Sequence, residues 1–357
     1  MDRTEKLLQE LTEAHGAPGH EAEVRAAMRR RLGPLGTLSQ DRIGSLICAL
    51  RGRKKAGPRV MLAAHMDEIG FMVRLVTEDG FLRFLPLGGW FDQVLLGQRV
   101  LVKTHRGDIP GVIGSKPPHL LPQEERGKVV EKKNMYIDIG ATSKKEVEEA
   151  GVRVGDPVVP DSRFAVLTGG RTYLAKAFDD RVGCALLVEA LEALARRAPP
   201  CAVFGAATVM EEVGLRGAKT SVDLVDPDAA VILESGIAGD VPGIKPEESS
   251  TRLGRGAELL FYDRDMIPNL KLRDLVIDTA RKLGVPLQLS AIEGGATDGA
   301  RIHLHKGGVP AVVLGVPARH IHSHTSIIHR ADYDAALKIA VAVVRRLDAA
   351  TVAGLTK

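Results

Sequence analysis

Carboxylates and histidines occur in five short clusters whose residue types could bind metal ions. His65 and Asp67 follow an apolar segment, and their spacing of two places both side chains on the same side of an extended chain. The imidazole could bind a metal ion while the carboxylate behind it orients the ring and raises its basicity. The alternative is a buried structural histidine beside an acid, and this motif taken alone favours that alternative.

Paired acidic residues form the second and third clusters. Asp179 and Asp180 precede a long helical pattern, where they could cap the helix or could bridge two cations. Glu211 and Glu212 end an apolar segment, where two carboxylates are costly to bury without a positive partner. A metal ion is one such partner, and the two glutamates could then divide metal binding and proton transfer between them.

The last two clusters are Glu234, which ends another apolar segment, and a histidine-rich stretch that follows residues 311–314. His320, His322 and His324 alternate, so the pattern leaves the choice among them open. Four of the five clusters follow expected strands, and an open α/β sheet binds ligands at the carboxyl ends of its strands. Oxygen and imidazole donors without thiolates suit zinc, cobalt or manganese, and a pair of such ions typically activates water. The clusters therefore indicate metal-assisted hydrolysis.

The elements that must position these clusters fall into two groups along the chain. We expect strands at 45–50, 59–64, 202–210, 230–233, 257–262 and 311–314, and helices at 2–15, 19–32, 180–197, 268–283, 297–305 and 331–347. Strands that alternate with helices predict an α/β fold in which helices cover both faces of the sheet, an α/β/α sandwich.

The middle of the chain has a different character. Short β-like segments separated by Gly, Pro and Asp run from about residue 70 to 165, with one helical stretch at 144–149. This pattern predicts a small β-rich barrel or sandwich. The two early strands fit the α/β sheet better, so we expect one discontinuous domain, residues 1–70 and 165–357, interrupted by an inserted β domain, residues 71–164.

The composition narrows the class of protein and its setting. A chain of 357 residues with 45% hydrophobic content can bury more than one core. A net charge of only +4 and 4% aromatic residues argue against nucleic-acid binding, and the basic run at 51–55 is expected to be a solvated loop. No apolar stretch approaches the ~20 residues of a membrane span, and no signal-peptide pattern begins the chain. With three scattered cysteines, these features predict a cytoplasmic protein without nucleic-acid or membrane partners.

Longer motifs resemble the M42 family of metallo-aminopeptidases along nearly the whole chain. The matching segments are HMDEIG at 65–70, LGGW at 87–90, GQ at 97–98, GSKPPH at 114–119, KAFDDR at 176–181, EEVGLRGA at 211–218, GGATD at 294–298 and PARHIHS at 317–323. The resemblance implies a hydrolase that removes N-terminal amino acids from peptides, with two divalent metal ions that hold a hydroxide between them. Zinc or cobalt is expected, and manganese is possible. The resemblance also implies that the inserted domain carries dimer contacts and that dimers build a dodecamer.

The same resemblance implies the metal ligands. Asp179 would bridge both ions, Glu212 and His322 would complete one site, and His65 and Glu234 would complete the other. It therefore selects His322 from the histidine-rich stretch.

Two further roles and two departures accompany this ligand set. Glu211 is expected to be the general base that deprotonates the water and later protonates the leaving amine, and Asp67 to orient His65. The family usually has Asp where this chain has Glu234, and tends to have Tyr where it has His320. We expect His320 to be no ligand.

Three alternatives remain at this level. A metal-independent glycoside hydrolase, a label sometimes given to relatives, would need two opposed carboxylates and no metal. A deacylase or another amide hydrolase would use the same two-metal site on blocked amino acids. A catalytically inactive assembly protein is disfavoured, because all five ligand positions hold competent side chains.

Overall fold

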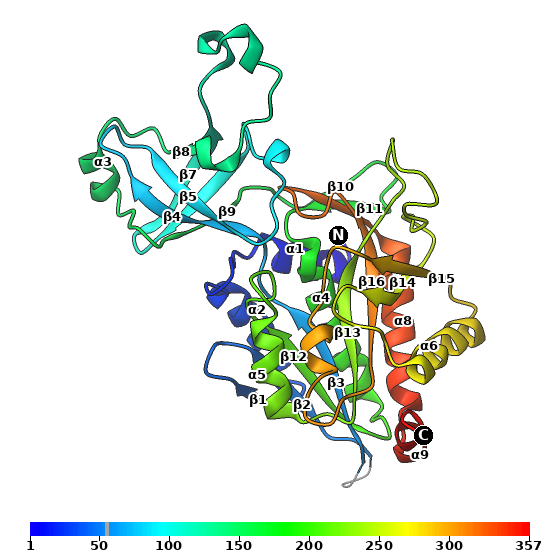
Figure 1. The fold of residues 1–357 in the computed structure, drawn as a ribbon. Coiled ribbons are helices and arrows are strands. Elements are labelled where there is room, and N and C mark those ends of the chain that lie inside the picture. The colour runs from blue at the N-terminus through cyan, green and yellow to red at the C-terminus, as the bar shows by residue number, and fades with distance from the viewer. Residues whose placement is uncertain (54–56) are drawn as a thin grey trace.

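The computed structural model describes residues 1–53 and 57–357, so Lys54 and Lys55 of the basic run lie outside the described residues. Within the described part, eleven strands form one mixed sheet and six others form a closed barrel (Figure 1). The expected α/β class with a small β barrel is therefore confirmed. None of the helices in these ranges is long and apolar enough to cross a membrane.

The large sheet is built around four parallel strands. Its order is β1-β2-β12-β3-β13-β16-β17-β11-β10, and β14 pairs with both β15 and β16. The bounds are β1 Thr37–Gln40, β2 Leu46–Leu50, β3 Arg59–His65, β10 Ala165–Val166, β11 Thr172–Ala175, β12 Ala202–Thr208, β13 Ala229–Ile237, β14 Ala257–Asp263, β15 Leu287–Ile292, β16 Ala311–Arg319 and β17 Ser326–His329. Strands β12, β3, β13 and β16 run parallel, so their carboxyl ends meet at one edge of the sheet.

Helices cover both faces of this sheet. One face carries α1 Arg3–Glu13, α2 Ala22–Leu32, α4 Phe178–Arg196, α6 Leu270–Leu283 and α8 Arg330–Arg346; the other carries α5 Arg216–Val225 and α7 Gly299–Ile302; α9 Ala349–Gly354 ends the chain. Along β3, Leu62 and Ala64 pack into the first core, whereas Met61 and Ala63 pack into the second. Because successive strand residues point to opposite faces, a strand covered on both sides must be apolar throughout.

The barrel is an antiparallel unit with its own core. Its order is β4-β5-β8-β7-β6-β9, with bounds β4 Gly70–Val76, β5 Leu82–Leu87, β6 Arg99–Thr104, β7 Gly107–Gly114, β8 Tyr136–Asp138 and β9 Pro157–Pro160. The helix α3, Lys144–Glu149, has the bounds that the sequence predicts. Phe71 stacks on Trp90 with ring centroids 4.7 Å apart, and the Trp90 indole N–H donates a hydrogen bond to the Gly70 carbonyl at 2.9 Å. This contact closes the barrel core close to the metal-binding candidates.

Several predicted elements have different lengths in the structure. β13 and β16 continue beyond their apolar runs because they stay paired in register from Ala230–Ala311 to Ile237–Ala318. β12 ends earlier than predicted, at Thr208, and Met210 then takes a left-handed backbone conformation with φ 54°. The helix expected at 297–305 is reduced to the single turn of α7, and the helix α5 was not predicted.

Candidate metal centre

The predicted ligands meet where two central strands separate. β13 pairs with β3 only as far as Ile232 and Ala63, although it stays paired with β16 up to Ile237. His65 is the last residue of β3, and Glu234 lies inside β13, not at its end as predicted. The separation leaves room between the two strands at their carboxyl ends, and both side chains face that space.

Two overlapping groups of donor atoms lie in this space. His65, Asp179 and Glu234 form one group, and Asp179, Glu212 and His322 form the other, with the donor atoms in each group within 4.8 Å of one another. Asp179 belongs to both groups: its Oδ1 lies 3.1 Å from His65 Nε2 and its Oδ2 lies 3.1 Å from His322 Nε2. One carboxylate thus presents a separate oxygen to each imidazole.

A glutamate completes each group. Glu234 Oε1 lies 3.7 Å from His65 Nε2, and Glu212 Oε1 lies 3.6 Å from His322 Nε2. The longer acid at position 234 also accepts a hydrogen bond from the Ser235 N–H at 2.9 Å, which fixes its direction. The structure therefore brings together all five side chains that the sequence singled out, whereas neither His320 nor His324 joins either group.

The Asp179–Asp180 pair divides into two roles. Asp180 is fully buried; it accepts hydrogen bonds from the His65 N–H at 3.1 Å and from the Gly183 N–H at 3.0 Å. This second acid therefore satisfies one backbone donor near the start of α4, which is the capping role that the sequence left open, and one at the end of β3. Asp179 alone turns toward the histidines.

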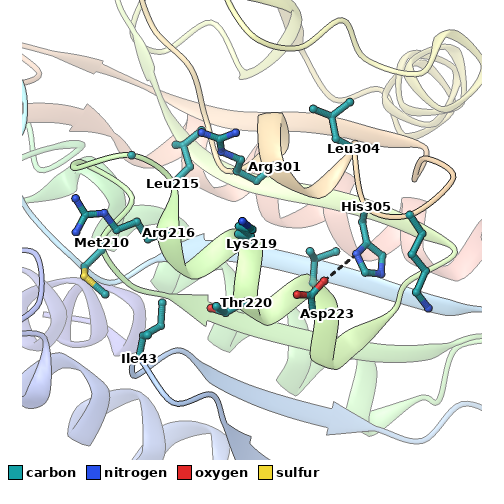
Figure 2. Close-up of a pocket in the computed structure, with 13 residues that line it drawn as sticks. Ile43, Met210, Leu215, Arg216, Lys219, Thr220, Asp223, Arg301, Leu304 and His305 are labelled. Carbon is teal, nitrogen blue, oxygen red and sulfur yellow. Dashed lines mark ion pairs between the residues drawn. The ribbon is translucent and has the colours of Figure 1, made fainter.

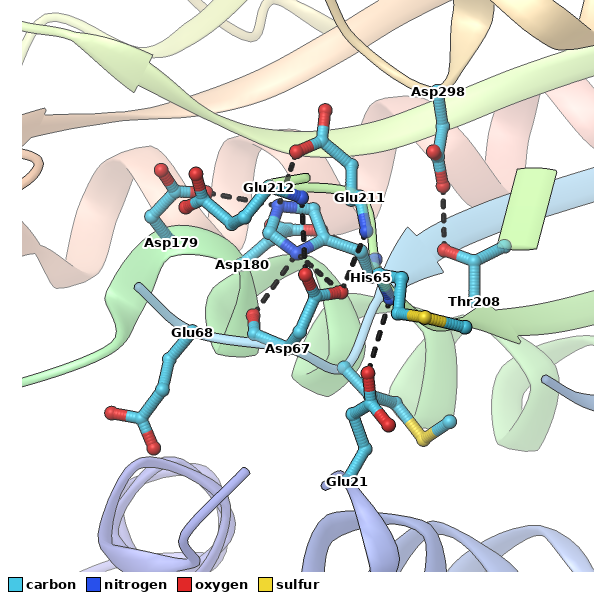
Figure 3. A network of polar contacts seen from close by, with 12 residues as sticks. Glu21, His65, Asp67, Glu68, Asp179, Asp180, Thr208, Glu211, Glu212 and Asp298 are labelled. Carbon is cyan, nitrogen blue, oxygen red and sulfur yellow. Dashed lines mark hydrogen bonds and ion pairs between the residues drawn. The ribbon is translucent and has the colours of Figure 1, made fainter. Parts of the chain in front are cut away.

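Asp67 connects three parts of the centre (Figure 3). Its carboxylate oxygens accept the backbone N–H groups of Glu211 and Glu212, each at 3.0 Å. His65 Nδ1 lies 3.0 Å from the Asp67 carbonyl oxygen and 3.6 Å from its carboxylate. Asp67 thus orients the imidazole and also anchors the backbone of both glutamates, a second contact that the sequence pattern does not reveal.

His322 is oriented from the barrel. Its Nδ1 lies 2.8 Å from the carbonyl oxygen of Gly89, which follows β5, so Nδ1–H donates and Nε2 stays free to face Asp179. A Cβ added at Gly89 would lie 2.9 Å from this Nδ1, so only glycine fits without displacing the ring. His324 packs against Trp90 with ring centroids 5.1 Å apart, which gives it a structural place beside the same loop.

The backbone next to the acidic ligands is unusual. Ala177, Met210 and His322 have φ of 57°, 54° and 57°, a left-handed conformation that non-glycine residues rarely adopt. Such conformations persist only where the surroundings enforce them, and they concentrate at functional sites. Here they turn the chain just before Asp179, just before Glu211, and at His322 itself.

Burial and crowding of acids shift the protonation of the centre. Burial raises the pKa of Glu211 and Glu234 well above the ordinary value, and neighbouring carboxylates raise both pKa values further. Burial, followed by the charge of Asp179, raises the pKa of Glu212 to about 8. Burial opposes ionisation of Asp179 too, but hydrogen bonds from His322 and His65 hold its pKa below the ordinary value. These acids are therefore costly to ionise together unless further positive charge lies beside them.

The donor set fits two divalent cations. Glu212 Oε1 is buried without a hydrogen-bond partner among the described residues, although it faces His322. Unsatisfied buried carboxylate oxygens are costly, and a cation is the natural partner for several of them at once. Oxygen and imidazole donors are the set that zinc, cobalt and manganese prefer.

A cavity of about 590 Å³ opens over this centre. His65, Asp179, Glu212, Glu234 and His322 lie on its wall, together with Glu211, whose Oε2 is 4.0 Å from His65 Nε2. The cavity is large enough for an amino-acid residue and places a proton-carrying carboxyl group beside the donor groups. Arg264 and Arg301 also line the cavity, and Arg264 pairs there with Asp265 at 2.9 Å.

Comparisons with known proteins agree with this geometry. The sequence model described as M42 glutamyl aminopeptidase matches residues 44–339, and the glutamyl aminopeptidase of Lactococcus lactis subsp. cremoris (strain MG1363) is 36% identical over 96% of each chain. The crystal structure of a TET aminopeptidase from the marine sediment archaeon Thaumarchaeota archaeon SCGC AB-539-E09 is similar with a TM-score of 0.97 and 48% identity over 99% of each chain. The Pyrococcus horikoshii TET1 peptidase, described as assembling into a tetrahedron or a large octahedral shell, has a TM-score of 0.86 and 32% identity over 96% of this chain and 99% of that chain.

Proposed function

The chain belongs to the M42 family and is an aminopeptidase of the hydrolase class, and from this premise we propose that it works with two divalent cations at the Asp179 centre. The observation that carries the proposal is that the two oxygens of Asp179 face His65 and His322 separately, in two overlapping donor groups. His65 and Glu234 would hold one ion, Glu212 and His322 the other, and Asp179 both.

The cations and Glu211 divide the chemistry. When bound, two such ions lower the pKa of a shared water and polarise the scissile carbonyl. Glu211 lies within the same cavity, and its raised pKa suits a group that accepts a proton from the attacking water and returns it to the departing nitrogen. Asp67 holds the Glu211 backbone while this exchange takes place.

The acidic character of the centre also fits a free amino terminus. A protonated α-amino group can be bound by carboxylates that line the cavity, whereas an acetylated terminus has no charge to offer them. This difference favours an aminopeptidase over a deacylase that uses the same cations. A metal-independent glycosidase would leave the imidazoles of His65 and His322 without a role.

We also propose that the inserted β domain, residues 71–164, carries contacts between subunits, and that dimers assemble into a tetrahedral dodecamer. Phe91, Leu120 and Val129 on this domain are exposed to 58%, 68% and 53%, so large apolar side chains are available there for a contact between subunits. The similar TET1 peptidase supports the proposal by its described assembly into a tetrahedron. Light scattering tests it, and a monomer at micromolar concentration would refute it.

A chelation experiment tests the chemistry. Dialysis against EDTA should remove hydrolysis of aminoacyl p-nitroanilides, and zinc or cobalt should restore it, with a bound-metal stoichiometry approaching two measured by elemental analysis. Matched peptides with free and N-acetylated termini, together with a β-glucan, should show cleavage of the free-terminus peptide alone. Full activity after metal removal, cleavage of the acetylated peptide or glucan hydrolysis would each contradict the proposal.

A further inference from the structure

A second groove, whose lining is drawn in Figure 2, shares lining residues with the cavity of the metal centre. It has a volume of about 710 Å³ and lies between the start of α5 and the segment that follows α7. Gly214, Leu215 and Arg301 line both spaces, so the groove and the catalytic cavity share a wall. The buried side chain of Leu215, held in a left-handed conformation with φ 58°, stands at the junction.

The side chains that line the groove carry more positive than negative charge. Arg216, Lys219 and Arg301 line it and are exposed, and none has an ion pair or a side-chain hydrogen bond to any residue in 1–53 or 57–357. The acids of the same region are already engaged: Asp223 lies 3.1 Å from His305 Nδ1, and Asp226 accepts a hydrogen bond from Lys306 at 2.7 Å. Figure 2 shows Lys219 between Leu215 and the Asp223–His305 pair. The groove is therefore a place where an anion gains several partners.

The position of Glu211 decides which part of a substrate reaches this groove. This step rests on the proposed function, in which Glu211 returns a proton to the departing nitrogen. The N–H groups of Gly214 and Leu215 donate to the Glu211 carbonyl at 2.9 and 2.8 Å, so a tight turn places the shared wall directly beside Glu211. The departing peptide must lie next to Glu211. The part of this peptide that leaves the cavity past the shared wall then enters the groove.

We propose that the groove binds the C-terminal carboxylate of a short departing peptide, through Lys219 and Arg301. A carboxylate is the one anionic group that every unmodified peptide carries, and a guanidinium with an ammonium group suits it. Both cations are exposed, so the attraction is modest and weakens as salt screens it. The groove thus makes the enzyme sensitive to the end of the peptide opposite to the one it cleaves.

Paired substrates test this site. Di-, tri- and tetrapeptides that share one readily cleaved N-terminal residue and continue with glycine are compared with the same peptides bearing a C-terminal amide. For the length that spans the groove, the wild type should cleave the free-carboxylate peptide with kcat/KM roughly threefold higher than the amide at low salt. Lys219→Gln and Arg301→Gln should each bring this ratio toward one, and Lys338→Gln, which removes a charge from α8, should leave it unchanged. High salt should lower the wild-type ratio in the same way.

The outcomes separate this site from the proposed function. If no peptide is cleaved after zinc or cobalt is restored, the proposed function fails. If peptides are cleaved but the ratio is near one at every length, or if Lys219→Gln and Arg301→Gln keep the wild-type ratio, the carboxylate site is refuted while the aminopeptidase mechanism stands.

Discussion

Gly89 is not one of the proposed metal ligands, but its substitution by alanine should weaken metal binding. The Gly89 carbonyl accepts from His322 Nδ1 at 2.8 Å, and this bond directs Nε2 toward Asp179 and Glu212. A Cβ at position 89 would lie 2.9 Å from Nδ1 and 3.2 Å from Cε1 of the same ring. Ordinary van der Waals contact begins near 3.4 Å, so the ring or the barrel loop must move by a few tenths of an ångström.

The expected loss of metal affinity follows from the hydrogen bond that the His322 ring loses. The displaced imidazole keeps its ligand atom but loses the hydrogen bond that fixes its tautomer and direction. Loss of such an outer partner typically reduces metal affinity about 10- to 100-fold, which corresponds to roughly 1.4–2.7 kcal/mol. The effect should fall on the ion held by Glu212 and His322, whereas the ion held by His65 and Glu234 should bind nearly as before.

Calorimetric titration of zinc or cobalt into the metal-free protein measures both binding steps without relying on activity. Gly127→Ala is the matched control, because it adds the same methyl group to the same domain with no heavy atom within 4 Å. Gly89→Ala should weaken one binding step, and the metal concentration that gives half-maximal peptidase activity should rise with it. Equal affinities in the two variants would show that the barrel does not position His322.

Three further predictions concern protonation and buried charge. Glu211→Gln should lower kcat at least roughly 100-fold with the metal content retained, and normal turnover would remove Glu211 from the proton path. Burial raises the pKa of Glu258 to about 7 from its ordinary 4.5, so the folded protein holds this proton more tightly than the unfolded chain. The free energy of unfolding should then fall by roughly 3 kcal/mol between pH 4.5 and 7, and urea unfolding of Glu258→Gln should lack this component. Lys176→Met should destabilise the fold by about 3–5 kcal/mol, since Lys176 Nζ lies 2.6 Å from both oxygens of the buried Glu68; a loss below 1 kcal/mol would mean that Arg181 alone balances that acid.

The architecture of the sheet was predictable because its central strands are covered on both faces. Such strands are continuous apolar runs, and β3, β13 and β16 contain the runs that the sequence predicts, whereas β2 and β12 cover most of theirs. The extensions of β13 and β16 beyond those runs depend on their pairing with each other, which is a property of two distant segments. α5 escaped prediction for a local reason: its N-cap is Leu215 in a left-handed conformation, with no side-chain cap to mark the start.

The candidate metal centre likewise has features that the sequence predicts and features that it does not. Acids and histidines that follow apolar strands are visible in a sequence, so the types and approximate places of the ligands could be predicted. The choice of His322 over its neighbours came from resemblance, because the contacts that distinguish its ring, with the Gly89 carbonyl and with Asp179, join segments far apart in sequence. The turns at Ala177 and Met210 give no sequence signal, since neither residue favours a left-handed backbone.

The three contacts of Asp67 link the parts of the centre into one structural unit. Its carboxylate accepts hydrogen bonds from the backbone N–H groups of Glu211 and Glu212, and its backbone carbonyl contacts the ring of His65, so one residue fixes a proton carrier and two ligands relative to one another. Substitutions at Asp67 and Glu211 should therefore be strongly non-additive, because the first already disturbs what the second removes. For protein engineering, the unit to transplant to another sheet is consequently the pair of strand ends that Asp67 joins. A single ligand moved without the other strand end would lose the contacts that position it.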